Sequence, residues 1–280
     1  MSAFTLLVML LAAVTTGVQD NAAAARKAFE ESNAAFEKTE NDKALAAYDR
    51  AIALDAKQPD FHLGRGRTLA RLQRYADAIA SCSDAIALNA DFAAAYLDRG
   101  HFRINARQVE QARPDLEKAR TLNADAYGVA YHLALSNYIL GDYEKAIPIY
   151  ETCVATAKTP ENTFGCSAWQ YVTLRRAGHA DAAAKVLERA TPDTKVTGGG
   201  AAYLDRLLLF KGAKTEEQVA AGMTDALQTP TVAYGIGVWH LLNNREAKAR
   251  EYFEKAAAPP SQQSAFGSVA AFYELQRMKK

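Results

Sequence analysis

One pattern occurs four times in this chain, as NDKALAAYDRAIALDA (41–56), RYADAIASCSDAIALNA (74–90), VEQARPDLEKARTLNA (109–124) and DYEKAIPIYETCVATA (142–157). Its first column is a small residue that recurs every 34 residues, at Ala44, Ala78, Ala112 and Ala146. A larger residue follows four positions later, and a small one three further on: Tyr48, Cys82, Leu116 and Tyr150, then Ala51, Ala85, Ala119 and Cys153. Positions three and four apart share a helix face, so each stretch predicts a helix with a buried stripe.

A second helix is predicted ahead of each of the later stretches. Its small residue is Gly66 in LGRGRTLA (63–70), Gly100 in LDRGHFRI (97–104) and Ala134 in YHLALSNY (131–138). Small residues let two helix axes approach to about 8–10 Å. Gly141 and Asp142 mark the end of one helix and the start of the next.

Two helices in a 34-residue period resemble the tetratricopeptide repeat (TPR), a helix-turn-helix unit. The resemblance implies an all-α, right-handed solenoid built from stacked units. Four regular units are predicted over residues 25–158, and degenerate units follow over 162–280. Within that second part, one regular unit is predicted at about residues 230–260, and a helix at 264–278 is expected to cap the open end.

The N-terminal residues 1–17 contain no charged side chain and carry an apolar run from Phe4 to Val14. That run predicts a signal peptide, and hence a periplasmic or secreted protein. It is too short to span a bilayer, and no cysteine near its end could carry a lipid anchor. The alternative is a cytoplasmic chain whose first helix is apolar.

Three cysteines are too few for a disulfide framework. Cys153 and Cys166 fall on consecutive predicted helices, so they form either one bridge or two buried thiols. Cys82 is expected in the core.

Composition and motifs argue against an enzyme or a nucleic-acid partner. The formal net charge is only +1, whereas phosphate backbones call for an excess of Lys and Arg. The histidines, His62, His101, His132, His179 and His240, stand singly and lack metal-ligand spacing. We therefore expect no catalytic residue, no metal site and no cofactor.

The second half carries a more particular resemblance, through YLDRLLLFKGAKTEEQV (203–219), YGIGVWHLLNNREAKAREYFEKAAA (234–258) and FGSVAAFYELQRM (266–278). These segments resemble, in order and spacing, the periplasmic adaptor family of new lipoprotein I (NlpI), whose lipid-bearing cysteine this chain lacks. The resemblance implies a scaffold that forms a homodimer and docks a periplasmic protease or a cell-wall hydrolase.

The first helix of each unit lines the concave groove of a TPR solenoid, which suits an extended peptide or a helix. The repeat register predicts which side chains project into this groove and bind the partner. They are Leu63, Arg67, Arg71, Leu97, His101, Asn105, Tyr131 and Tyr138. Arginine would pair with a carboxylate and tyrosine would supply apolar area. The alternative is that the tyrosines pack between units and the arginines are merely solvated. The Lys and Asn arrangement of chaperone-docking TPR proteins is absent from these positions.

Three functions remain open on the sequence. They are a periplasmic protein-binding scaffold, a cytosolic TPR interaction protein, and a periplasmic glycan- or lipid-binding protein. Trp169 and Trp239 could stack on a sugar, but both stand at helical spacing in apolar stretches, which favours core packing.

Overall fold

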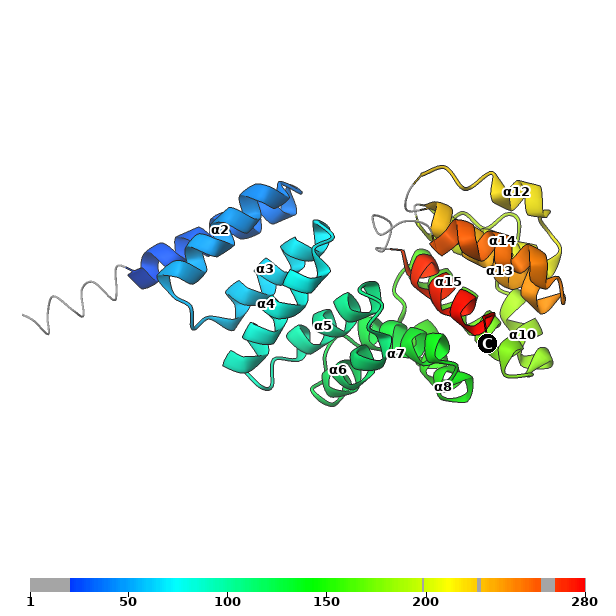
Figure 1. Cartoon of the computed structure of the whole chain (residues 1–280), viewed down its shortest axis with the longest axis horizontal. Helices are drawn as coiled ribbons and strands as arrows, with labels where there is room; N and C mark the ends of the chain where they lie inside the picture. The colour runs from blue at the N-terminus through cyan, green and yellow to red at the C-terminus, as the bar shows by residue number, and fades with distance from the viewer. Residues whose placement is uncertain (1–20, 198, 226–227, 258–264, 280) are drawn as a thin grey trace, which may run out of the picture. The chain divides into compact units, whose positions relative to one another are not determined.

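The computed structural model describes residues 21–197, 199–225, 228–257 and 265–279, and within these ranges its regular elements are all helices (Figure 1). The all-α prediction is therefore confirmed. The predicted signal peptide, residues 1–17, lies outside the described residues. Over the ranges described, every helix is too short or too polar to cross a bilayer.

A first helix covers residues 21–37. The helices that follow are α2 (Asn41–Leu54), α3 (Pro59–Arg71), α4 (Tyr75–Leu88), α5 (Ala93–Asn105), α6 (Val109–Thr121), α7 (Ala126–Leu140), α8 (Tyr143–Thr156), α9 (Pro160–Arg176), α10 (Ala180–Leu187), α11 (Gly199–Lys211), α12 (Glu216–Ala220), α13 (Gln228–Leu242), α14 (Glu246–Ala257) and α15 (Phe266–Arg277).

The repeated small residues lie where two helices of one unit cross. Ala44, Ala78, Ala112 and Ala146 are all fully buried, at 0% exposure. A Cβ atom added at Gly100 would stand 2.7 Å from Leu116 Cγ and 3.3 Å from the carbonyl oxygen of Ala112. At Gly66 the corresponding neighbours are Cys82 Sγ at 3.1 Å and the Ala78 oxygen at 3.2 Å. The helix-turn-helix packing predicted from the columns is confirmed.

The helix ends follow the predicted residues, with one correction. Gly141 ends α7 in the left-handed conformation, with φ of 87°. The Asp125 carboxylate accepts a hydrogen bond from the Gly128 N–H and caps the start of α7. Asp142 stands at the N-cap position of α8 but makes no capping hydrogen bond. Its carboxylate instead accepts from Arg113, at 2.6 Å, because the charged pair is the stronger interaction.

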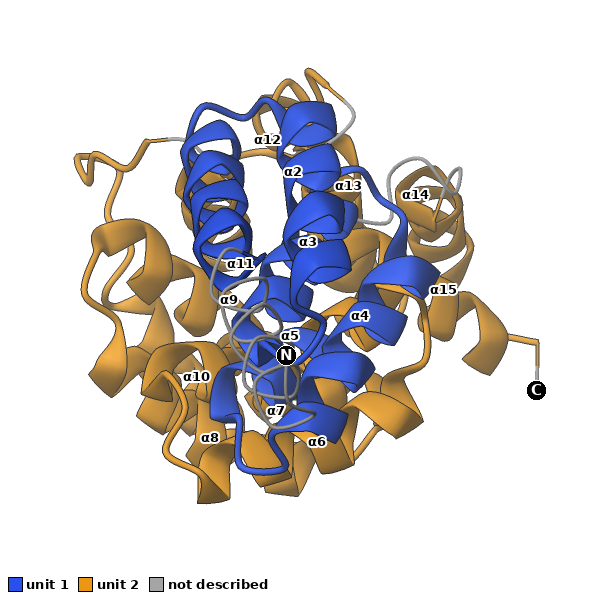
Figure 2. Ribbon diagram, turned by 90° about the vertical axis from the view of Figure 1, so that its left-hand side faces the viewer, with its two compact units in different colours: residues 1–99 blue, residues 100–280 orange. Residues whose placement is uncertain are grey.

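The chain divides into two compact units, residues 1–99 and 100–280 (Figure 2). In the first unit, neighbouring helices pack in chain order, α2 on α3 and α3 on α4. The helix over residues 21–37 joins this stack. Its Phe29 ring lies 4.8 Å from that of Phe61, and its Asn33 accepts a hydrogen bond from the Tyr48 hydroxyl at 2.7 Å.

The second unit adds contacts between helices far apart in the sequence. In addition to neighbour packing, α13 contacts α9, and α15 contacts α7, α13 and α14. Trp169 lies at 0% exposure in this core, with its ring centroid 5.2 Å from that of Tyr234. The core placement of Trp169 is thereby confirmed.

Cys153 and Cys166 form a disulfide that joins α8 to α9, with Cα atoms 5.9 Å apart. Of the two arrangements left open by the sequence, the structure has the bridge. Cys82 is a free, buried cysteine, as expected.

Candidate functional site

The predicted partner-binding residues fall in both units. Leu63, Arg67, Arg71 and Leu97 belong to residues 1–99, and His101, Asn105, Tyr131 and Tyr138 belong to residues 100–280. The two arginines of the first group are exposed, whereas Asn105, Tyr131 and Tyr138 of the second group are buried.

In the first unit, α3 presents two exposed arginines one turn apart. The Arg67 Nε donates to Asp98 Oδ2 at 2.5 Å, and the Arg67 side chain remains 46% exposed. The guanidinium of Arg71 lies 3.3 Å from the ring centroid of Phe36 and donates to the Phe36 carbonyl oxygen. Burial raises the pKa of the Asp98 carboxyl, and the charge of Arg67 opposes that rise. The arrangement offers two cations beside an aromatic ring.

Leu97 and Leu63 complete the first group in different ways. Leu97 is half-buried, so part of its side chain remains accessible. Leu63 is only 4% exposed. Its inclusion in the binding set was wrong, because α3 packs between α2 and α4 and an apolar side chain gains more from that core than from water.

In the second unit, the two predicted tyrosines belong to the core. The Tyr138 hydroxyl is 2.7 Å from that of Tyr234, and Tyr138 is 1% exposed. Tyr131 accepts from Trp169 Nε1 at 3.1 Å and lies 3.1 Å from the Tyr203 hydroxyl. Burial raises the pKa of both Tyr131 and Tyr138. Neither is offered to a partner, because α11 and α13 return to the face on which they stand.

The terminal helix α15 covers the same face. The Phe266 ring lies 5.5 Å from His101, 5.7 Å from Tyr131 and 5.4 Å from His132, centroid to centroid. Farther along α15, the Glu274 carboxylate accepts from Arg176, and Arg277 donates to a carbonyl oxygen at the end of α7. The chain's own C-terminal helix thus occupies the part of the groove predicted for a partner.

Two histidines that stand far apart in the sequence meet under this helix. The rings of His101 and His132 stack at 4.4 Å. Burial lowers the pKa of His132 to about 4 and that of His101 well below its usual value. Asn105, itself 3% exposed, lies with its Nδ2 3.3 Å from His101 Nε2. His101 and Asn105 therefore contribute to the packing of the second unit. Nothing in the sequence indicated that the rings of His101 and His132 would stack.

One small opening remains beside this core. It has a volume of about 380 Å³ and is lined by Tyr127, Tyr131, Tyr203, Glu161, Asn162, Gly165, Thr197, Gly199 and Gly200. Glu161 already accepts hydrogen bonds from the backbone and hydroxyl of Thr197. Among the described residues, no group of three or more His, Cys, Asp or Glu side chains could hold a metal ion.

Comparison with known proteins identifies the repeat. A family model described as tetratricopeptide repeat matches residues 29–95 and 97–161. RNA polymerase II-associated protein 3 of Xenopus laevis is 32% identical over 134 residues, which are 48% of this chain and 20% of that protein. Hsc70-interacting protein 1 of Drosophila melanogaster is 37% identical over 84 residues, or 30% of this chain and 22% of that protein. The chain thus spans about a fifth of the length of these relatives.

Solved structures agree on the fold. A crystal structure of MamA protein superposes with a TM-score of 0.54 at 21% identity, covering 62% of this chain and 98% of that one. The MamA fragment from Desulfovibrio magneticus RS-1 gives the same TM-score at 19% identity, covering 59% and 92%. At this identity the likeness concerns the fold alone.

Proposed function

We propose that this chain, whose residues 29–95 and 97–161 match the tetratricopeptide-repeat model, is a non-catalytic adaptor that binds another protein through the Arg67–Arg71 face of α3. The partner segment carries a carboxylate for the two guanidinium groups and an apolar side chain for Phe36 and Leu97. The single observation that supports this assignment is that Arg67 and Arg71 are exposed while the equivalent face of the second unit is filled by α15.

The chemistry of the α3 face favours a peptide carboxylate. Arginine binds carboxylates through paired N–H donors, and it is enriched where proteins recognise one another. Arg67 already pairs with Asp98, so an incoming carboxylate competes with that partner. That competition is strong, because burial leaves the Asp98 carboxylate poorly solvated and a buried charge without its partner is costly.

The relatives support a protein partner. Two of the relatives are named for their association with another protein, which is RNA polymerase II for one and Hsc70 for the other. The Lys and Asn pattern of chaperone-docking TPR proteins is missing from the register positions of this chain. We therefore propose that the chain is a protein-binding adaptor and that its partner is not a chaperone.

A capture experiment tests the α3 face. The full chain, immobilised, is exposed to extract from its own source, and the bound proteins are identified by mass spectrometry. The double variant Arg67→Gln/Arg71→Gln loses most of the specific capture. Arg74→Gln is the matched control, because Arg74 is an exposed arginine of the same unit that pairs only with Asp77, at 2.6 Å, and it retains capture. Undiminished capture by the double variant would refute the assignment.

We further propose that the chain works outside the cytoplasm. Two features support export: the apolar run from Phe4 to Val14, and the disulfide between Cys153 and Cys166, since such bonds persist in oxidising compartments. The resemblance to the NlpI family then favours a periplasmic protease or a cell-wall hydrolase as partner. N-terminal sequencing of the purified protein checks this, because a mature chain that begins near Gly17 has been processed. An intact Met1 would favour the cytosolic alternative.

From the same resemblance to the NlpI family, we propose that the chain forms a homodimer. Sedimentation of the unprocessed chain tests this directly, since a monomer of all 280 residues has a mass of 30.4 kDa. A sedimenting mass equal to that of the monomer would contradict the proposal.

A further inference from the structure

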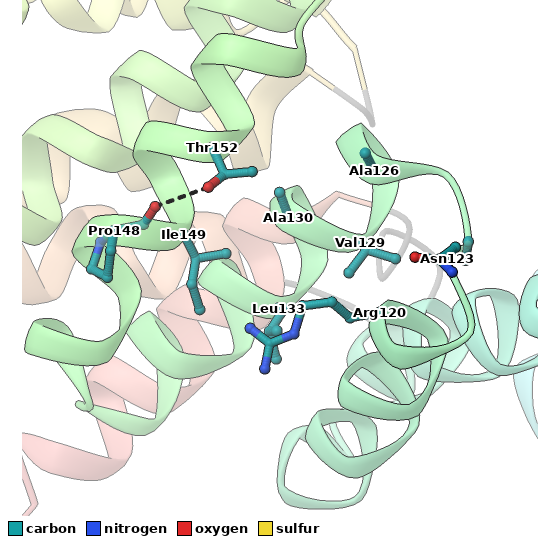
Figure 3. Close-up of a pocket in the computed structure, with 10 residues that line it drawn as sticks. Arg120, Asn123, Ala126, Val129, Ala130, Leu133, Pro148, Ile149 and Thr152 are labelled. Carbon is teal, nitrogen blue, oxygen red and sulfur yellow. Dashed lines mark hydrogen bonds between the residues drawn. The ribbon is translucent and has the colours of Figure 1, made fainter.

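A cleft opens on the second unit between α6 and α8, with α7 as its floor (Figure 3). It consists of two adjoining hollows, of about 560 Å³ and about 470 Å³. The hollows share the residues Arg120, Leu133, Pro148 and Ile149. A volume of this size is in the range of pockets that hold ligands.

The cleft is apolar because of the residues that the sequence places on its floor and wall. Val129, Ala130 and Leu133 of α7 form the floor, and each is at most 3% exposed. Pro148 and Ile149 of α8 form the wall, and Pro148, inside the helix, has no N–H to offer a ligand. A side chain larger than the methyl group of Ala130 would fill the space between the two outer helices.

Two polar groups in the cleft have no protein partner. Asn137 is 3% exposed and lines the second hollow, where its Nδ2 donates to the Leu133 carbonyl oxygen at 3.0 Å. Its Oδ1 is buried without a hydrogen bond. Arg120 is exposed at the mouth of both hollows, and its guanidinium makes no hydrogen bond or ion pair with any described residue. A buried acceptor without a hydrogen bond is unfavourable, so the Asn137 oxygen points to a ligand with an N–H group.

The other charged groups at the rim leave Arg120 as the available cation. Arg113 donates to Asp142 at 2.6 Å, and Lys145 also pairs with Asp142, at 3.4 Å. Glu117 is the acidic residue of the second hollow. The first hollow, where Arg120 meets the apolar floor, therefore has one cation and no carboxylate among its lining residues.

We propose that this cleft is a second interaction surface, which takes a segment of a partner protein ending in, or followed at once by, a carboxylate. A Leu- or Ile-sized side chain of that segment fills the hollow over Ala130. A backbone N–H donates to the Asn137 Oδ1, and the carboxylate binds Arg120 through paired N–H donors. A peptide is the class of molecule that carries all three groups at neighbouring positions.

N-acetyl-L-leucine is a small probe that carries a Leu-sized side chain, an amide N–H and a carboxylate. In the full chain with labelled methyl groups, its addition shifts the NMR signals of Val129, Leu133 and Ile149 and leaves that of Leu97 unchanged. Its neutral amide, which lacks the carboxylate, binds at least about fivefold more weakly, because it loses the charge-assisted hydrogen bonds to Arg120. Equal affinity of acid and amide, or shifts confined to other methyl groups, would overturn the proposal.

Two variants test the residues. Arg120→Gln weakens binding of the acid at least about fivefold and removes the difference between acid and amide. Arg26→Gln, in the other unit, removes an exposed arginine in the same way and leaves binding unchanged. Ala130→Leu fills the hollow and abolishes binding, and its thermal unfolding midpoint shows whether the chain is still folded. Wild-type affinity in Arg120→Gln would contradict the assignment.

A longer probe distinguishes a protein segment from a free carboxylic acid. N-acetyl-Ala-Ala-Leu offers further N–H groups toward the hollow of Asn137, so it binds more tightly than N-acetyl-L-leucine. Affinity no greater than that of the single residue would exclude a peptide as the occupant.

Discussion

Single small residues set how closely the helices of this chain approach. The added Cβ atom at Gly237 would lie 2.7 Å from the Phe253 ring and 3.3 Å from the Ala249 carbonyl oxygen. Gly100 meets Leu116 and Ala112 in the same way. The same close contact occurs at two positions far apart in the chain. A small residue at the crossing point therefore allows helix pairs to form in both halves of the sequence.

We expect Gly237→Ala to destabilise the chain by about 1–3 kcal/mol, because the new methyl group forces the Phe253 ring or the backbone of α14 to move. Gly165→Ala is the matched control: it also lies inside a helix, but its Cβ atom would meet nothing closer than 3.6 Å. That variant gains about 0.5–1 kcal/mol, since alanine loses less backbone entropy in a helix than glycine does. Denaturant unfolding of both measures the difference, and equal stabilities would contradict the packing described.

The pair His101–His132 predicts a pH dependence of stability. The pKa of His132 is lowered to about 4 by burial, against about 6.5 in an unfolded chain. The unfolded state therefore binds more protons below pH 6.5, and stability falls as the pH falls from about 6.5 to about 4. His101 acts in the same direction.

The loss attributable to His132 is on the order of 2–3 kcal/mol at the acid end. Unfolding free energies measured at several pH values in wild type and in His132→Gln check this. The variant should show a shallower decline between pH 6.5 and 4, although carboxylates contribute to both curves. Identical slopes would show that folding does not lower the pKa of His132.

At the scale of elements, α15 determines what the second unit can bind. Its Phe266 contacts the aromatic face of α7, and its Glu274 lies between two arginines, Arg176 at 3.3 Å and Arg277 at 2.9 Å. Glu274 is 2% exposed, so its charge is held by these partners and not by water. The helix is consequently part of the core and cannot leave the groove without breaking the ion pair between Glu274 and the largely buried Arg176.

Glu274→Gln should cost about 3–5 kcal/mol, because it leaves two cations without their buried counter-charge. Glu251→Gln is the control, since Glu251 pairs with Lys248 at 3.0 Å on an exposed surface where both side chains are more than half accessible. That change should cost no more than about 1 kcal/mol. Unfolding free energy and amide exchange along α15 report the outcome. An equal effect of the two changes would mean that Glu274 does not anchor the helix.

At the scale of the whole molecule, the two units differ in how their helices are connected. In residues 1–99, helices contact their neighbours in the chain, as in an ordinary repeat array. In residues 100–280, α13 also contacts α9, and α15 contacts α7. Opening one helix in the second unit therefore breaks contacts with several others.

Amide hydrogen exchange should show the difference directly. We expect α7, α9 and α13 to exchange more slowly than α2 and α3, because local opening is less favourable where contacts are non-local. The measurement uses the full chain under native conditions, with mass spectrometry of peptides from each helix. Faster exchange in α9 than in α3 would contradict the described packing.

The residue pattern alone was enough to predict the helices and how they pair. A period of 34 residues with small residues in fixed columns leaves one packing arrangement, and Ala44, Ala78, Ala112 and Ala146 are buried as that arrangement requires. These contacts are local in the chain, so spacing alone specifies them. It also allowed the bridge between Cys153 and Cys166, since the two cysteines fall on consecutive helices.

Which of the predicted binding residues stay accessible depends on how distant helices pack, and spacing in the sequence does not show that packing. Arg67 and Arg71 stay exposed, whereas Tyr131 and Tyr138 are covered by helices that follow much later in the chain. A repeat register gives the direction of a side chain within its own unit, but it carries no information about a distant segment that returns to cover it. The cleft beside Arg120 and Asn137 lies among three consecutive helices, and it was missed for a different reason: a repeat register does not give the volume that remains between side chains.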